Sequence, residues 1–444
     1  MLGWKIVEGG EYKVPLEKLS EEELQVVLNV EEKFKQVART REISSREEAL
    51  SLIRDSVVWY GEAEGILFDK DQIDYLSETA LLHIYGYGFV EKILEDPEVE
   101  EVSVIGIGKP AYVYIRGKGW LQTNAAFTDE KALMEVINKM GRGIGRRITL
   151  QKPKLNAVLP DGSRLHATLF PLSQGELTVR KFTEHPFSPS ELAKLRTFPY
   201  RAMAALSLVM QSDMSLIVSG NTASGKTTTL NSLFSFVPLD ERVIITEETP
   251  EINVPHPQKV RLVANEEMGI PLRELVYDTL RMRPDRLIVG EVRSREEVET
   301  LFDALLGGQA RGCYATFHAQ NTDETLRRFK FYGIDELDFK SIDCVLVQRR
   351  VLNYDRKSRK LREMRRMIEL SFGRPLTPLF RYEPKGDRWN EKALKPFLSS
   401  VSSSLGISEK EGGEELKARE KFIRKEHDFF EFCEAYQRRF YGIG

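Results

Sequence analysis

The stretch "IVSGNTASGKTTTLNSLF", residues 217–234, places two glycines, a lysine and a run of three threonines between an apolar segment and a helix-like one. Gly220, Gly225, Lys226 and Thr227 fit the pattern G-x-x-x-x-G-K-[ST] at every fixed position. Glycines at these positions allow backbone conformations that point successive N–H groups inward, and the following helix presents its positive N-terminus. The stretch therefore predicts a phosphate-binding loop between a strand and a helix.

The expected nucleotide-binding residues are the whole loop and the start of its helix: Gly220, Asn221, Thr222, Ala223, Ser224, Gly225, Lys226, Thr227 and Thr228. Lys226 is expected to contact the β- and γ-phosphates, and the Thr227 hydroxyl to ligate Mg²⁺. A chance match to the pattern is the alternative. The buried-strand pattern before the loop and the helical pattern after it are the context that the motif requires, and they argue against chance.

The composition is that of a folded, soluble protein, because 41% of the 444 residues are hydrophobic and 30% are charged. No apolar run approaches the roughly 18 residues of a membrane span, and the first residues lack a signal-peptide layout, so a cytoplasmic chain is expected. Cys313, Cys344 and Cys433 form no CxxC pair, which predicts packing or surface residues and no zinc site. The net charge of −3 makes nucleic acid an unlikely partner.

The pattern changes along the chain predict separate parts. Residues 1–80 are expected to form a helical N-terminal module that begins its first long helix with a capping box at Ser20 and Glu23. Residues 81–183 alternate short strands with turns and a helix, which predicts an α+β domain. Residues 184–200 are rich in proline and lack a clear period, which predicts a linker and hinge.

Residues 201–370 alternate four short apolar runs with helical segments, so an α/β domain with a parallel sheet is expected there. The nucleotide should then bind at the carboxyl ends of the strands. Residues 371–444 are predicted to be a mostly helical extension. Its last helix has apolar residues at three-to-four spacing, which favours packing on the domain, with a partner-docking helix as the alternative.

Acidic residues and a histidine follow three of these apolar runs. Glu247 and Glu248 end "VIITEE", and adjacent side chains on a strand point in opposite directions, so at most one can activate the attacking water; we favour Glu247. Glu291 in "RLIVGE" holds a Walker B-like position suited to ordering Mg²⁺, with a surface glutamate as the alternative. His318 after "CYATF" is either a hydrogen-bond partner of the γ-phosphate or its water, or a structural histidine.

These segments together resemble the type II/type IV secretion-system ATPase superfamily, and most of all its archaeal branch. "GYGFVEKILEDPEVEEVSV", "PDGSRLHATLFPLSQGELTVRKF", "TEETPEI", "LRMRPDRLIVGEVR" and "ATFHA" occur with the phosphate loop in the family's order, over roughly residues 80–370. The resemblance implies a RecA-like P-loop NTPase domain preceded by an α+β domain. It also implies catalytic roles for Glu247, Glu291 and His318, with Mg²⁺ bound by Thr227 and Glu291.

The resemblance further implies two arginines outside the P-loop domain. Arg164 of "DGSR" would be catalytic and Arg180 of "VRKF" would bind nucleotide; a surface ion pair is the alternative for each. Two departures from the family are Ser294, where many relatives carry Asp, and the absence of a four-cysteine zinc element from the sequence. The second departure favours the archaeal branch.

The expected function is a hexameric hydrolase with ATP and Mg²⁺ as cofactors, whose domain motion powers a secretion, type IV pilus or archaellum machine. The expected partners are further copies of the chain and a polytopic membrane platform protein, which would bring the chain to the inner face of the cell membrane. One rival is a nucleic-acid-translocating P-loop motor, which needs a basic, aromatic-lined channel. The other is a scaffold that binds ATP without turning it over.

Overall fold

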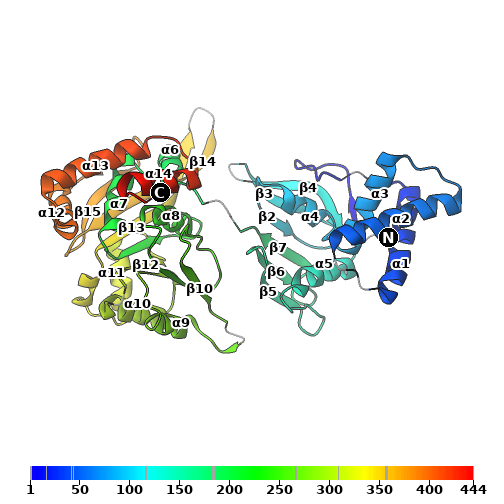
Figure 1. Ribbon diagram of the computed structural model, residues 1–444, viewed down its shortest axis with the longest axis horizontal. Coiled ribbons are helices and arrows are strands. Elements are labelled where there is room, and N and C mark those ends of the chain that lie inside the picture. Colours follow the sequence, from blue (N-terminus) through cyan, green and yellow to red (C-terminus); the bar gives the residue numbers. More distant parts are fainter. Residues whose placement is uncertain are drawn as a thin grey trace. The chain divides into compact units, whose positions relative to one another are not determined.

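The computed structural model describes residues 3–16, 18–41, 43, 45–115, 118–182, 186–265, 268–308, 310–355 and 359–443. The chain divides into two compact units, Met1–Thr183 and Glu184–Gly444 (Figure 1). Each unit has its own apolar core. The division falls where the predicted 184–200 linker begins, and positions 184 and 185 of that prediction lie outside the described residues.

The first unit begins with a strand and three helices: β1 Trp4–Ile6, α1 Glu21–Thr40, α2 Arg46–Glu64 and α3 Lys70–Ile84. α1 starts with the predicted capping box, because the Ser20 side chain accepts from the Glu23 N–H and the Glu23 carboxylate accepts from the Ser20 N–H at 2.7 Å. Val27, Ile53 and Ala80 meet in the core of the three helices. β1 was not predicted, and it pairs with the sheet of this unit rather than with the helices.

The rest of the first unit is an antiparallel sheet in the order β1-β4-β3-β2-β7-β6-β5, with two helices. Its elements are α4 Phe89–Glu95, β2 Val99–Val104, β3 Pro110–Ile115, β4 Gly119–Phe127, α5 Glu130–Arg142, β5 Lys154–Val158, β6 Arg164–Thr168 and β7 Glu176–Arg180. Leu133 and Ile137 of α5 and Phe89 of α4 pack into the core with the inward residues of the strands. This is the α+β fold that the sequence predicts.

The second unit contains a nine-stranded sheet in the order β10-β9-β11-β12-β8-β13-β14-β15-β16. The bounds are β8 Leu216–Gly220, β9 Val243–Glu247, β10 Lys259–Val263, β11 Arg286–Val292, β12 Gly312–Phe317, β13 Cys344–Asp355, β14 Lys360–Phe372, β15 Thr377–Glu383 and β16 Arg388–Glu391. β8 to β13 are parallel to their neighbours, and β14 to β16 add an antiparallel edge. The four predicted apolar runs form β8, β9, β11 and β12.

Both faces of β8, β9, β11 and β12 are buried, which explains their continuous apolar sequence. Along β8, Leu216 and Val218 enter one core cluster and Ile217 enters the other, as the two-residue period of a strand requires. The helices of this unit are α6 Pro189–Lys194, α7 Tyr200–Gln211, α8 Lys226–Leu233, α9 Leu272–Thr279, α10 Arg295–Gly307, α11 Thr322–Phe331, α12 Leu394–Leu405, α13 Glu409–Ile423 and α14 Phe429–Phe440, with short 3₁₀ segments η1 Phe234–Phe236 and η3 Asp338–Ser341. A doubly covered parallel sheet is the predicted α/β architecture.

The described part of the predicted 184–200 linker differs from the expectation. It contains α6, whose capping box uses Ser188 and whose first residue is Pro189. The Ser188 hydroxyl also donates to the carbonyl of His427 at 2.8 Å, which joins the segment to the C-terminal helices. Proline is favourable at the first position of a helix, so its presence here starts a helix and does not break one.

The C-terminal extension also differs from the expectation in one respect, since the sheet continues to Glu391 through β15 and β16, beyond the predicted domain end at 370. After it, α13 and α14 lie against α6 and α7 (Figure 1). The buried Gln437 side chain of α14 donates to the carbonyls of Ser235 and Val237 and accepts from the Leu239 N–H. The last helix is therefore packed on the segment that follows the P-loop helix α8.

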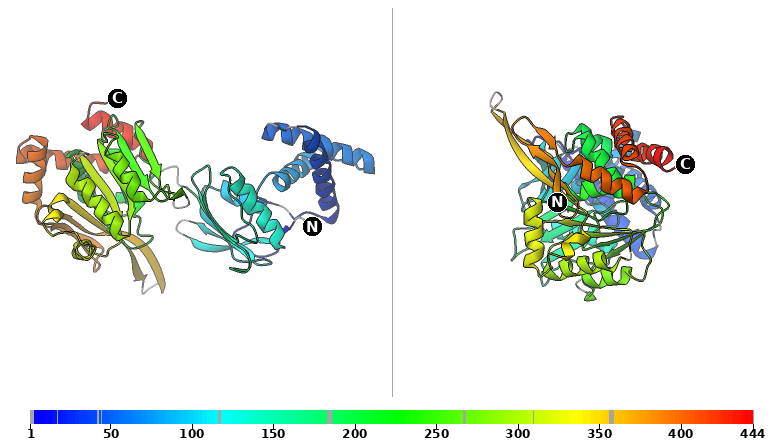
Figure 2. Two further views of the ribbon diagram at one scale, coloured as in Figure 1. Left: turned by 90° about the horizontal axis from the view of Figure 1, so that it is seen from below. Right: turned by 90° about the vertical axis from the view of Figure 1, so that its left-hand side faces the viewer.

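The β13–β14 hairpin extends beyond the rest of the sheet (Figure 2). At its base, β13 runs beside β8 with Gln348 opposite Gly220, so the hairpin lies directly behind the phosphate loop. Within the described part of the chain, no helix combines the length and the apolar character that crossing a bilayer requires.

Candidate functional site

Two glycines shape the phosphate loop. A Cβ on Gly220 would lie 2.1 Å from the carbonyl oxygen of Gln348, and one on Gly225 would lie 3.0 Å from the Gln348 side chain. Gly225 also has φ of 94°, a left-handed conformation that side chains disfavour, and it caps the N-terminus of α8. The loop thus turns tightly against β13 and leads into the positive end of a helix.

Lys226, the first residue of α8, is only 7% exposed. Its Nζ lies 3.3 Å from the Gly220 carbonyl and 3.4 Å from the Asn221 carbonyl, and burial lowers its pKa. The Ser224 hydroxyl is buried and has no hydrogen-bond partner among the described residues. A loop of this geometry, with a buried cation and an unused donor, fits the phosphates of a nucleotide.

Glu291 and His318 come from β11 and from the residue after β12, two parallel strands whose carboxyl ends meet the loop at one edge of the sheet. The Nε2 atom of His318 is hydrogen-bonded to a Glu291 carboxylate oxygen and lies 3.4 Å from the Nζ of Lys226. Arg293 is paired with the other Glu291 oxygen. The structure therefore brings together Lys226, Glu291 and His318, which the sequence predicted separately.

The pKa of Glu291 shows that this carboxylate stays charged. Burial would raise it, but the hydrogen bonds from His318 and Arg293 outweigh burial and bring the pKa to about 2. No group of three or more metal-ligating side chains occurs among the residues that the structure describes. Thr227 and Glu291 remain the expected Mg²⁺ ligands, and Mg²⁺ commonly takes only one or two protein ligands and completes its shell with phosphate and water.

Glu247, predicted to activate water, ends β9 and is 2% exposed. One carboxylate oxygen accepts from the N–H groups of Glu251 and Ile252 at 2.7 and 2.8 Å, and the other lies 3.3 Å from Nε of Arg261. Burial raises the pKa of Glu247 to about 7 in spite of these contacts. This geometry suits a side chain that holds the turn after β9 in place.

Glu251 lies in the turn that Glu247 holds, and the sequence reasoning missed it. Its carboxylate accepts a hydrogen bond from the Thr227 hydroxyl at 2.9 Å, and its carbonyl accepts from Asn231 of α8 at 3.1 Å. Glu248 instead pairs with Arg293 at 3.3 Å. The available signal was the third acid of "TEETPEI", but which acid reaches the phosphate loop depends on the path of the turn at Pro250.

Arg164 and Arg180 belong to the first unit. Arg164 begins β6 and Arg180 ends β7, and they stand directly opposite each other in the antiparallel ladder. Opposite residues share a face of the sheet, so the two guanidinium groups gather positive charge at one place. On the other side of β7, Arg180 stands opposite Glu101 of β2.

A pH-dependent change in stability is expected from Glu247. Its folded pKa of about 7 exceeds the ordinary value of 4.5, so the folded state holds the proton more tightly than the unfolded one. The stabilisation is complete below pH 4.5 and is lost as the pH rises through about 7. The free energy of unfolding is measured by denaturant at pH 5 and pH 8. Between these two pH values, the parent should lose up to about 3 kcal/mol more of this free energy than Glu247→Gln, which has no carboxyl group to titrate there. Equal pH dependence of the two proteins would contradict the raised pKa.

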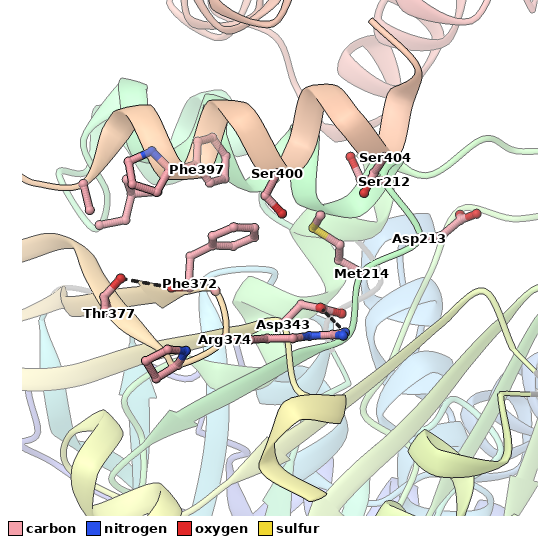
Figure 3. A pocket seen from close by; sticks show the side chains of 15 residues that line it. Ser212, Asp213, Met214, Asp343, Phe372, Arg374, Thr377, Phe397, Ser400 and Ser404 are labelled. Carbon is pink, nitrogen blue, oxygen red and sulfur yellow. Dashed lines mark hydrogen bonds and ion pairs between the residues drawn. The ribbon is translucent and has the colours of Figure 1, made fainter. Parts of the chain in front are cut away.

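A cavity of about 660 Å³ lies at the opposite end of the strands from the phosphate loop (Figure 3). It is lined by α12, by the residues that precede β8 and β13, and by the end of β14. Phe372 and Phe397 line its apolar part. The carboxylate of Asp343 is paired with Arg374 at 2.7 Å, and that of Asp213 with Arg286 at 2.8 Å. The cavity is thus separate from the phosphate loop, which lies at the carboxyl end of β8.

The loop, the parallel sheet and the acidic and histidine residues at its carboxyl edge define a P-loop nucleotide-binding protein with a RecA-like domain. Residues 86–389 match the family described as Type II/IV secretion system protein. Since the match covers more than half of the chain, the chain belongs to that family. Residues 390–444, which include α12, α13 and α14, lie beyond the match.

The relatives include archaeal and bacterial proteins. The chain is 35% identical over 267 residues to an uncharacterised protein of Methanocaldococcus jannaschii, covering 59% of this chain and 47% of that one. It is 32% identical over 262 residues to a putative conjugal transfer protein of Mycobacterium tuberculosis, covering 56% and 73%. Among solved structures, the Legionella pneumophila ATPase DotB is 18% identical, with 76% of this chain and 88% of that chain covered and a TM-score of 0.48.

The archaeal relatives agree with the predicted archaeal branch of the superfamily. The chain spans less than half of the length of the first two Methanocaldococcus jannaschii proteins that it matches.

Proposed function

We propose that the chain is a Mg²⁺-dependent ATPase that works as a homo-hexamer and drives a membrane-embedded secretion, pilus or archaellum machine through a polytopic partner. The observation that carries the proposal is the meeting of Lys226, Glu291, His318 and the Thr227–Glu251 pair at one edge of the sheet. Membership of the Type II/IV secretion family supports the link to secretion and pilus machines.

Each residue can be given a role in this proposal. The loop N–H groups and Lys226 would hold the β- and γ-phosphates, while Thr227 and Glu291 would hold Mg²⁺. Bound Mg-ATP supplies the phosphoryl group and a metal that neutralises developing charge. His318 keeps Glu291 oriented and ionised through its hydrogen bond. Arg180 would add a cation for nucleotide binding.

The carboxylate of Glu251 accepts a hydrogen bond from the Thr227 hydroxyl, the expected Mg²⁺ ligand, so we assign to Glu251 the orientation or deprotonation of the attacking water. Glu247 then acts through Glu251, because its carboxylate binds the backbone N–H of that residue. This replaces our sequence-based preference for Glu247 with a positioning role for that side chain.

Phosphate release from Mg-ATP, measured over a series of protein concentrations, tests the proposal. A ring motor should release many phosphates per chain, with a specific activity that rises as the hexamer assembles. A scaffold would bind nucleotide and release no more than one phosphate per chain. Activity that depends on single-stranded DNA would favour the nucleic-acid motor, and full activity of a monomer in parallel light scattering would contradict the ring.

Arg164→Ala is expected to lower turnover by at least about tenfold while changing ADP affinity little, because an arginine from another domain acts on the charge that develops during phosphoryl transfer. Steady-state kinetics and ADP titration measure the two effects. Arg54→Ala, which removes a surface ion pair with Asp74 in the same unit, is the matched control. If Arg164→Ala loses ADP affinity and turnover to the same extent, Arg164 contributes to nucleotide binding in the ground state and not to catalysis.

A further inference from the structure

Two turns of the first unit lie side by side at one end of its sheet. The first precedes β5, where the N–H of Thr149 bonds the Lys152 carbonyl at 3.2 Å and the N–H of Lys152 bonds the Thr149 carbonyl at 3.1 Å. The second follows β6, where the N–H of Leu172 bonds the Leu169 carbonyl at 2.9 Å. β5 and β6 pair with each other, and the N–H of Leu169 bonds the Pro153 carbonyl at 2.9 Å, so the two turns are neighbours.

These turns expose three large apolar side chains. Leu150 is 62% exposed, Phe170 is 68% exposed and Leu172 is 59% exposed. Leu169 between them is buried and anchors the second turn in the core. A single exposed apolar residue is ordinary, but three on adjacent turns form a patch that is costly to leave in water and that indicates an interaction surface.

The first turn and the segment leading into it are basic. Residues 146–154 contain Arg146, Arg147, Lys152 and Lys154 and no Asp or Glu. Lys152 and Lys154 are exposed on the first turn and the start of β5. Two acids on nearby elements also make hydrogen bonds here: Glu130 accepts from the Phe170 N–H at 3.1 Å and Glu176 accepts from the Thr168 hydroxyl at 3.1 Å. The four basic residues of the first turn and its lead-in outnumber these two acids.

We propose that this apolar–basic tip, formed by Leu150, Lys152, Lys154, Phe170 and Leu172, binds directly to the surface of an anionic lipid bilayer. Apolar side chains flanked by lysines suit the lipid interface, where the rings and aliphatic groups enter the acyl boundary and the ammonium groups stay among the lipid phosphates. The core of a protein–protein interface is instead depleted of lysine. The side chains also stand on turns, which suits insertion into a soft surface.

This inference goes beyond the proposed function, which places the membrane contact in a partner protein. It needs neither nucleotide nor assembly of a secretion machine. Lys226→Ala, which should abolish hydrolysis, is therefore expected to bind vesicles like the parent. Failure of the ATPase proposal and failure of the lipid proposal can be told apart by that variant.

The loop between α2 and α3 of the same unit provides a matched control. It exposes Ile66 and Leu67, the latter at 98%, and so offers similar apolar groups. Its charged neighbours are mainly acidic, namely Glu62, Glu64, Asp69, Lys70 and Asp71. An anionic bilayer should be repelled there, so this loop is expected to contribute nothing to lipid binding.

Co-sedimentation of the full chain with vesicles tests the tip. The parent should bind vesicles of phosphatidylcholine with phosphatidylserine, should not bind phosphatidylcholine alone, and should be released by high salt. Lys152→Glu with Lys154→Glu should lower the partition coefficient by at least about tenfold, since each basic residue near such a surface contributes about fivefold. Phe170→Ser with Leu172→Ser should lower it to a similar extent. Leu67→Ser with Lys70→Glu should leave it unchanged.

Circular dichroism and thermal unfolding check that each variant is folded, which is expected of the tip and control variants because their substituted side chains are exposed. Equal binding to neutral and anionic vesicles, or equal loss in the tip and control variants, would overturn the proposal. So would a parent that binds neither vesicle. If instead the tip variants change the molar mass of the parent assembly in light scattering without lipid, a second copy of the chain covers the tip and the lipid assignment is wrong.

Discussion

Replacing Lys226 by alanine is expected to reduce kcat/KM for ATP by about a thousandfold or more, because the side chain is the buried cation of the phosphate loop. In a site of low exposure a charge interacts more strongly with phosphate than it would in water. The alanine variant lacks this cation, so the negative charge of the bound phosphates stays uncompensated. Phosphate release and equilibrium titration with an ATP analogue measure turnover and binding separately.

Two controls make the lysine result specific. Lys385→Ala removes an exposed lysine from the turn between β15 and β16 of the same unit and should behave like the parent. Lys226→Arg keeps the positive charge, but its planar guanidinium cannot occupy the space of a compact ammonium between two loop carbonyls, so it should rescue little turnover. If Lys226→Ala is folded and retains most of the parent turnover, the loop is not the hydrolytic site.

Much of the second unit could be predicted because its strands carry an unambiguous signal. Strands buried on both faces read as continuous apolar runs, and β8, β9, β11 and β12 do so. Parallel strands bring their carboxyl ends to one edge, so the residues that follow them are neighbours however far apart they are in sequence. Lys226, Glu291 and His318 meet for that reason.

Other features depend on tertiary contacts that the sequence does not show. The alternation rule separated Glu247 from Glu248, but it ends with the strand, and the position of Glu251 depends on the hydrogen bonds that Glu247 makes to the turn. Pro189 suggested a flexible linker, whereas after Ser188 it begins the buried helix α6. β15 and β16 are short, exposed along one face and rich in charge, so their sequence lacks the apolar run that marked the parallel strands.

Glu251→Gln is expected to lower kcat by about a hundredfold or more, since it removes the carboxylate that accepts from the Thr227 hydroxyl and that would take the proton of the attacking water. Glutamine has the same shape and can still accept the Thr227 hydrogen bond, so ADP affinity should change only about a few-fold. Steady-state kinetics and ADP titration provide the comparison. Glu248→Gln, which removes the ion pair with Arg293 on the neighbouring acid, is the matched control and should stay close to the parent.

A magnesium titration separates the two chemical roles that a carboxylate beside Thr227 can have. If Glu251 acts on water, excess Mg²⁺ leaves the loss in kcat unchanged; if it mainly holds the metal, excess Mg²⁺ restores turnover. Glu247→Gln should lose less than Glu251→Gln, because an amide oxygen can still accept from the N–H groups of Glu251 and Ile252. The opposite ranking, with Glu247→Gln inactive and Glu251→Gln at the parent rate, would return the water-activating role to Glu247.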